Sequence, residues 1–267
     1  MRTRFICLLS GLALAATSQA AIQLTHNGSV VDIDENTSTI TNWFVNGTDQ
    51  VFQHQYYFRS GDAGNANLAS TIGAPVTTQF GARAAEVVYT SGSMRLTLTY
   101  LLTGALNGLT AELAETALIE NIGNSTLNMR FFQYNDYNLN NTAGNDTVQR
   151  LNSSTIGAND NAVTSITTVG GGTPIPDFSE IANVFPTLRN NIDNTNGYFL
   201  NTAVGGGIGQ SLSGDVSYAF QWNPTINPGG SFIVSTHKVT VVPEPGSMIA
   251  LGLGAAALLA RRRRKIA

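Results

Sequence analysis

The stretch MRLTLTYLL, residues 94–102, decides the fold class of this chain because its apolar side chains recur at every second position. That period is typical of a β-strand with one buried face. The stretch VSYAFQW, residues 216–222, repeats the pattern with larger aromatic side chains. Both segments therefore predict strands that pack one face against a core.

The rest of the body continues in short segments of the same kind, separated by turn-forming pairs such as Asn46-Gly47 and Asn107-Gly108. Many short strands with such punctuation favour an all-β fold, an antiparallel β-sandwich of jelly-roll or immunoglobulin-like type with at most one or two short helices. The further predicted strands are Val51–Arg59, Glu86–Thr90, Ala117–Ile122, Leu127–Tyr134, Ala162–Val169, Tyr198–Asn201 and Phe232–Val241.

Two segments are less clear. Residues 109–119 are rich in Ala, Leu and Glu and are compatible with a helix, but their apolar residues also share one strand face, which favours a strand. Asp177, followed three residues later by Glu180, has the spacing of a helix N-cap. We therefore expect one short helix to begin there.

The N-terminus carries a secretory signal peptide over residues 1–20. A basic start is followed by an apolar run from Phe5 to Ala16, and small residues precede the Ala20–Ala21 bond, where we expect cleavage. Signal peptidase and the secretion machinery are therefore predicted partners. The sole cysteine, Cys7, leaves with this peptide, so the body contains no disulfide.

The charge of the chain is concentrated at its ends. Seven of the fourteen basic residues lie in the signal peptide or the tail, so residues 22–242 carry seven basic and sixteen acidic side chains, a net charge of about −9. Affinity for nucleic acid depends on clustered Lys and Arg. Nucleic acid is therefore excluded as a partner.

Catalytic and metal-binding patterns are weak. His26, His54 and His237 stand far apart with no second ligand at a zinc spacing, so we predict no metal centre, no cofactor and no catalytic residue. The segment Asp32–Asn36 begins like a calcium loop, but Thr37 occupies the position that requires glycine. A looser calcium site there, or at Asp136 or Asp160, stays open as an alternative to ordinary turn chemistry.

Glu115 is the acidic residue with the strongest case for a functional role. On the strand interpretation it shares the face of Leu113 and Ala117, and buried carboxylates often have perturbed pKa values and functions. The opposing interpretation is a glutamate at a strand end or on an exposed helix face.

Aromatic residues beside amides suggest a ligand face. Exposed rings next to Asn, Gln and Asp stack on sugars, so Tyr134, Asp136 and Tyr137 form a speculative carbohydrate-binding face. In strands, however, Phe and Tyr more often belong to the core.

The last 25 residues have a distinct three-part order. The two prolines of Pro243-Glu244-Pro245 disfavour both helix and sheet, so an extended segment is expected there, and an apolar run over residues 247–260 follows it. The run is shorter than the roughly 20 residues of a permanent span. The basic end, which should stay on the cytoplasmic side, consists of Arg261, Arg262, Arg263, Arg264 and Lys265.

This tail resembles the PEP-CTERM sorting signal of Gram-negative, exopolysaccharide-producing bacteria. The resemblance implies that an exosortase recognises Pro243, Glu244 and Pro245 and processes the chain at the inner membrane, where residues 247–260 form a transient membrane helix. The protein is then a substrate of that enzyme and is delivered to the cell surface or extracellular matrix. A looser resemblance, through the segment 133–137, to other bodies with this tail implies no activity.

The sequence thus predicts three parts: a signal peptide (1–20), a β-sandwich body (21–242) and a sorting tail (243–267). For the body, one hypothesis is a non-catalytic surface or matrix protein associated with exopolysaccharide and biofilm. The alternative is a secreted carbohydrate-binding or carbohydrate-active β-sandwich protein, since such folds host both kinds of function.

Overall fold

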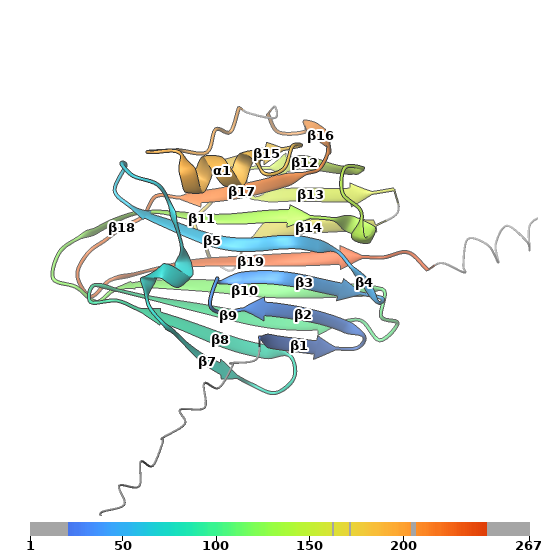
Figure 1. The fold of residues 1–267 in the computed structure, drawn as a ribbon, viewed down its shortest axis with the longest axis horizontal. Helices are drawn as coiled ribbons and strands as arrows, with labels where there is room; N and C mark the ends of the chain where they lie inside the picture. The colour runs from blue at the N-terminus through green and yellow to red at the C-terminus, as the bar shows by residue number, and fades with distance from the viewer. Residues whose placement is uncertain (1–20, 162, 171, 204–206, 245–267) are drawn as a thin grey trace, which may run out of the picture.

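The protein is described here by a computed structural model that places residues 21–161, 163–170, 172–203 and 207–244. These residues form two antiparallel sheets stacked as a sandwich, with one α-helix, α1 (Thr187–Asn194), at one edge (Figure 1). The predicted antiparallel β-sandwich is confirmed. The predicted signal peptide and tail helix lie outside the described residues.

The first sheet has ten strands. Its main path runs in the order β1 (Ile22–His26), β2 (Ser29–Asp34), β3 (Thr39–Val45), β5 (Val51–Ser60), β11 (Leu127–Tyr137), β17 (Ser217–Trp222) and β15 (Phe178–Ala182). Three two-residue strands flank this path: β4 (Thr48–Asp49), β6 (Asn67–Leu68) and β18 (Thr225–Ile226).

The second sheet has nine strands. Its order is β16 (Ser211–Gly214), β12 (Asp146–Asn152), β13 (Thr155–Asp160), β14 (Val163–Val169), β19 (Ser231–Val241), β10 (Thr110–Asn121), β9 (Met94–Gly104), β8 (Ala84–Thr90) and β7 (Pro75–Gln79). Two short 3-10 turns, η1 (Ala69–Ile72) and η2 (Leu139–Asn141), complete the described elements.

The main core lies between the sheets. Along β10 buried and half-buried residues alternate strictly, so Leu113, Glu115 and Ala117 all point inward, and the strand interpretation of this segment is confirmed. Trp43 and Trp222 fill the same layer from β3 and β17. Since neither sheet can bury its apolar face alone, this shared core holds the two together.

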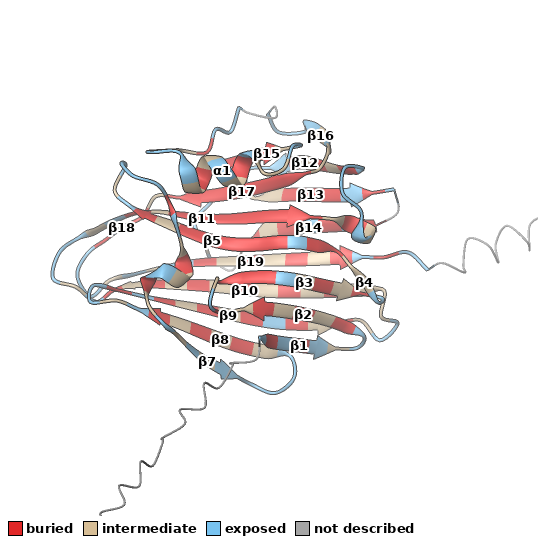
Figure 2. Ribbon diagram, in the orientation of Figure 1, coloured by how far each residue is buried: buried red, intermediate tan, exposed pale blue. Residues whose placement is uncertain are grey.

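A second, smaller core covers the outer face of the ten-stranded sheet beneath α1. It explains why β11 and β17 are buried along almost their whole length (Figure 2). Its buried members are Tyr57, Ala66, Phe132, Tyr134, Leu188, Ile192, Leu200 and Ala219.

Two sequence predictions were wrong here. Residues 198–201 form no strand, because the Leu200 and Asn201 amides donate to the side chains of Gln221 and Glu180 instead of to a neighbouring strand. The helix expected at Asp177 is strand β15, paired with β17, and Asp177 accepts a hydrogen bond from the Asn223 amide at 2.7 Å. Tertiary pairing outweighs the local capping pattern, and the helix begins ten residues later.

Candidate functional site

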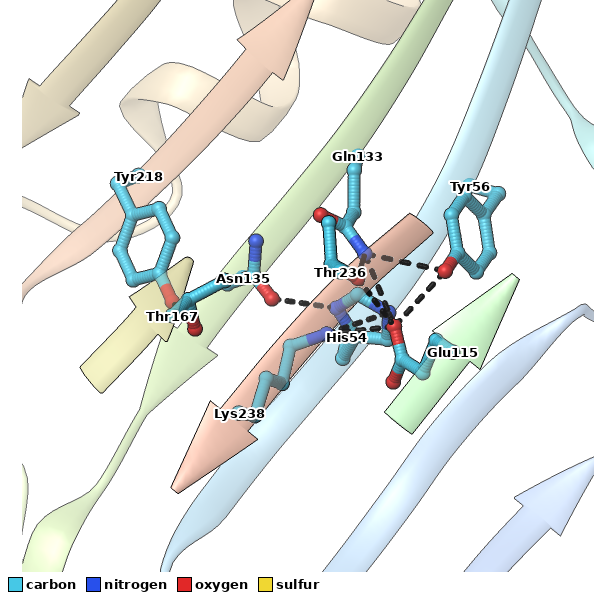
Figure 3. Close-up of polar contacts among 9 residues, drawn as sticks. All are labelled: His54, Tyr56, Glu115, Gln133, Asn135, Thr167, Tyr218, Thr236 and Lys238. Atoms are coloured by element: carbon cyan, nitrogen blue, oxygen red, sulfur yellow. Dashed lines mark hydrogen bonds and ion pairs between the residues drawn. The ribbon is translucent and has the colours of Figure 1, made fainter. Parts of the chain in front are cut away.

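The centre of the sandwich holds a cluster of polar side chains that joins the two sheets (Figure 3). His54 and Tyr56 come from β5, while Gln133 and Asn135 come from the neighbouring β11. The other sheet contributes Glu115 from β10, with Thr236 and Lys238 from β19. Strand register sets this meeting, since Gln133 pairs with Tyr56, Asn135 with His54, and Glu115 with Thr236.

One oxygen of Glu115 is the hub of the cluster. Its Oε2 accepts hydrogen bonds from Lys238 Nζ at 2.5 Å, Tyr56 Oη at 2.8 Å and Gln133 Nε2 at 2.9 Å. His54 Nε2 lies 3.0 Å from the same atom. The other oxygen, Oε1, has no protein partner. The glutamate is therefore held from both sheets through a single atom.

The electrostatics favour a buried ion pair between Glu115 and Lys238. Burial alone would raise the pKa of Glu115, but His54 and Lys238 outweigh it and hold that pKa well below its usual range. Burial lowers the pKa of Lys238, against the pull of Glu115. Burial likewise lowers the pKa of His54, against the pull of Glu115.

The cluster is closed to solvent. The side chains of Glu115 and Lys238 are 1% and 2% exposed, and that of His54 is 3% exposed. The adjoining cavity, lined by His54, Asn135 and Lys238 among others, has a volume of about 10 Å³, close to the least that one water requires. A Glu–His–Lys set has the residue types for acid–base chemistry, but no substrate reaches this one.

Glu115 was expected to share the buried face of Leu113 and Ala117, and the structure places it there. The sequence search missed Lys238 and treated His54 as an isolated histidine. One signal was available: Thr236, Lys238 and Thr240 occupy alternate positions on the face that also bears Val234. A lysine at such a position predicts a buried partner of opposite charge.

The three residues predicted as a ligand face do not form an exposed surface. Tyr134, Asp136 and Tyr137 are all at most 2% exposed. Tyr134 lies in the outer core under α1 and donates to Asp136 Oδ2 at 2.9 Å, whereas Tyr137 stacks on Tyr218 in the core between the sheets. The alternation of side chains along β11 places Tyr137 on the opposite face of the sheet from Tyr134 and Asp136.

The residues considered for calcium are engaged by neutral donors. Asp32 accepts hydrogen bonds from the Gln23 and Asn42 amides, and Asp160 accepts from three asparagine side chains. Asp136 keeps one buried oxygen without a protein partner, and burial raises its pKa to about 7. Among the described residues, no group of three or more His, Cys, Asp or Glu side chains is arranged to hold a metal ion.

An open groove lies between β15 and α1, away from the closed cluster. It has a volume of about 490 Å³, within the range of small-ligand sites. Ala182, Leu188 and Leu212 contribute apolar surface, and the amides of Asn183 and Asn191 contribute polar groups. Glu180 and Tyr198 meet within its lining, where Tyr198 Oη donates to Glu180 Oε2 at 2.7 Å.

The fold is shared with several solved structures. A bacterial glucoamylase complexed with acarbose superimposes with a TM-score of 0.56 at 10% identity, over 84% of this chain and 32% of the glucoamylase chain. A putative aldose 1-epimerase from Escherichia coli K12 gives 0.54 at 10% identity, over 84% of this chain and 99% of the epimerase. A galactose mutarotase related enzyme from Lactobacillus acidophilus gives 0.53 at 8% identity, over 84% of this chain and 97% of that protein.

These identities establish a common fold and nothing more. The chain spans only about a third (32%) of the length of the glucoamylase. Comparison with curated protein sequences gave no match.

The C-terminal residues identify how the protein is sorted. Residues 241–265 match the family model of the PEP-CTERM protein-sorting motif, as the Pro243-Glu244-Pro245 sequence predicted. The match begins at the last residue of β19, and no helix among the described residues is long and apolar enough to cross a bilayer. The motif marks an extracellular protein sorted by an exosortase, so this chain is a PEP-CTERM motif-containing β-sandwich protein.

Proposed function

We propose that the mature protein is a non-catalytic component of the cell surface or extracellular matrix, associated with exopolysaccharide in a biofilm. The observation that carries this proposal is the sorting motif at residues 241–265, which begins at the last residue of the last strand of the folded body. After cleavage at Ala20–Ala21, residues 247–260 hold the chain in the inner membrane until an exosortase acts at Pro243, Glu244 and Pro245.

The closed cluster supports the non-catalytic part of the proposal. The set of acidic and basic side chains centred on Glu115 is sealed between the sheets. Removing one partner of a buried ion pair typically costs several kcal/mol, about 3–5. The cluster therefore acts as a polar link between the sheets and not as a reaction centre.

Mass spectrometry of the protein from its native host tests the sorting step. We expect surface-exposed protein to lack peptides from residues 261–267, and the variant Glu244→Ala to remain in the membrane with its tail intact. Ser247→Ala, which lies outside the three motif residues, is the matched control and should be processed normally. Mature surface protein that retains residues 261–267 would contradict the proposal.

A second candidate function is carbohydrate binding in the groove between β15 and α1. The groove supports it through its size and its mixture of apolar surface and amide groups, which suits a sugar with one apolar face and a rim of hydroxyls. The same fold occurs in a glucoamylase complexed with acarbose and in an aldose 1-epimerase, which makes sugars the first ligands to test.

Titration of the exported protein with polysaccharide from its host separates the two candidates. If the groove binds sugar, Asn191→Ala should weaken binding, while Asn124→Ala, in the exposed turn after β10, should not. Absence of binding would remove the second candidate. Release of shortened sugars by the wild-type protein would overturn the non-catalytic proposal.

A further inference from the structure

The sorting motif leaves the folded body with almost no linker. Val241 still pairs with Thr110 in β10, and the Val242 amide donates to the Leu109 carbonyl at 2.8 Å. Val242 itself is only 9% exposed. The body therefore holds the chain until one residue before Pro243.

Only Pro243, Glu244, Pro245 and Gly246 separate this point from the apolar run. The five steps from Val242 to Ser247 span at most about 18 Å when fully extended, since each residue covers no more than about 3.6 Å. The headgroup layer on each side of a bilayer takes up about 5–8 Å of that length. When the apolar run lies in the membrane, the end of the sandwich is thus within about 10–13 Å of the lipid headgroups.

The end of the sandwich from which β19 leaves includes hairpin turns, together with η2 and the start of β14 (Figure 1). The β1–β2, β3–β4 and β9–β10 turns meet there, because Asn27 Nδ2 donates to the Gly104 carbonyl and β2 pairs with β3. We name these three turns the exit end. Its exposed residues are all uncharged: Asn27, Gly28, Asn46, Gly47, Leu106 and Asn107.

The charge and hydrophobicity of the exit end suit contact with a bilayer. Residues 22–242 carry a net charge of about −9, which a bilayer with anionic lipids repels, so the uncharged exit end approaches it at a low electrostatic cost. Leu106, at the tip of the β9–β10 turn, is 95% exposed, the highest value among the large apolar side chains that the structure describes. It lies three residues from Leu109, whose carbonyl holds Val242.

We propose that, before processing, the exit end faces the membrane and Leu106 inserts into the lipid interface beside the sorting motif. This inference rests on the proposed function, because it requires residues 247–260 to enter the bilayer. It goes further by assigning an orientation to the body and a lipid contact to one residue. The bound partner is a lipid surface, and contact with the exosortase instead is an outcome that the test distinguishes.

The chain suits single-cysteine labelling, since Cys7 is its only cysteine and leaves with the signal peptide. Leu106→Cys and Ile122→Cys place an environment-sensitive fluorophore at opposite ends of β10, and Ile122 is a matched apolar control at 43% exposure. Each labelled chain, with its tail intact, is incorporated into vesicles of phosphatidylethanolamine and phosphatidylglycerol that carry a headgroup-level quencher. Flotation with the vesicles reports whether the tail inserts.

We expect quenching at position 106 to exceed that at position 122 severalfold. With the label moved to Asn46→Cys at the same end, the added substitution Leu106→Asp should reduce quenching, because the apolar contact is lost. A chain that does not float overturns both the membrane step of the proposed function and this inference. If the chain floats but is quenched equally at 106 and 122, this inference alone is overturned. The same holds if the label at position 106 is shielded only when exosortase is added.

Discussion

Replacing Lys238 by methionine tests whether its ion pair with Glu115, formed between two neighbouring strands of one sheet, stabilises the buried cluster that links the two sheets. Methionine keeps an unbranched side chain of similar length but removes the ammonium group that lies 2.5 Å from Glu115 Oε2. Both side chains are at most 2% exposed, so solvent cannot take over the role of the lost cation.

The expected loss of unfolding free energy is about 3 kcal/mol, the lower part of the range for breaking a buried pair by removal of one partner. The lower part applies because Tyr56 and Gln133 still donate to Glu115 Oε2. In a body of this size, about 3 kcal/mol corresponds to a fall in Tm of about 6–12 °C.

The loss should depend on pH in a defined direction. With Lys238 present, the folded-state pKa of Glu115 is held below its usual value, so the stability it confers is present above the unfolded-state pKa and is lost only as pH falls through the folded-state value. Without Lys238, one of the two side chains that offset burial is lost and only His54 remains, so the folded-state pKa of Glu115 is higher than in the wild type. The deficit of the variant should therefore grow as pH rises from about 4 to 8.

Urea unfolding followed by the fluorescence of the buried Trp43 and Trp222 measures this loss. His237→Met is the matched control, because His237 precedes Lys238 on the same strand but points to the other face with its side chain 44% exposed. Combining Lys238→Met with Glu115→Gln should recover part of the stability, since no buried charge is left alone. A loss below about 1 kcal/mol for Lys238→Met, with no change between acid and neutral pH, would refute an ion-pair role.

Three further predictions concern stability. Burial raises the pKa of Asp136 to about 7, and Asp215 adds to the rise, so the stability that the protonated Asp136 confers is full below about pH 4 and is lost as pH rises through 7. In urea titrations between pH 4 and 8, Asp136→Asn should therefore reduce this fall in unfolding free energy by up to about 4 kcal/mol. Gly104→Ala places a Cβ 2.3 Å from the His26 carbonyl oxygen, so calorimetry should show a loss of about 1–3 kcal/mol, whereas Gly92→Ala, with open space around it, should cost little. Tyr56→Phe removes a donor to Glu115 and should cost about 1–3 kcal/mol in the same urea assay; an unchanged midpoint would show that the bond contributes nothing.

The fold class was readable from the sequence because its signal is local. Alternation along residues 94–102 fixes a half-buried strand whatever its neighbours are, and β9 extends over Met94–Gly104. The same logic placed Glu115 on the inner face of β10. The capping pattern at Asp177 is equally local, but it failed because pairing with β17 decides the conformation there.

The cluster itself was beyond local patterns. Lys238 is 123 residues from Glu115 and 184 residues from His54. Its contact with Glu115 depends on the pairing of β19 with β10, and its contact with His54 depends on how the two sheets are stacked. Alternation gives the face of each strand but not which strand lies opposite. A buried lysine and a buried glutamate on separate strands were therefore two unexplained charges in the sequence and became one ion pair only in the fold.

Strand β19 connects that pair with the sorting signal. Lys238 lies three residues before Val241, the first residue of the motif match, and Val241 pairs with both Thr110 and Thr164. Cleavage upstream of Val241 would remove these pairs from β19, a central strand that also carries Lys238 of the buried cluster. Cleavage at or beyond Pro243 leaves the sheet complete. If cleavage falls at or beyond Pro243, the tail can therefore be removed from a body that has already folded, without loss of the strand pairs of Val241 or the hydrogen bond of Val242.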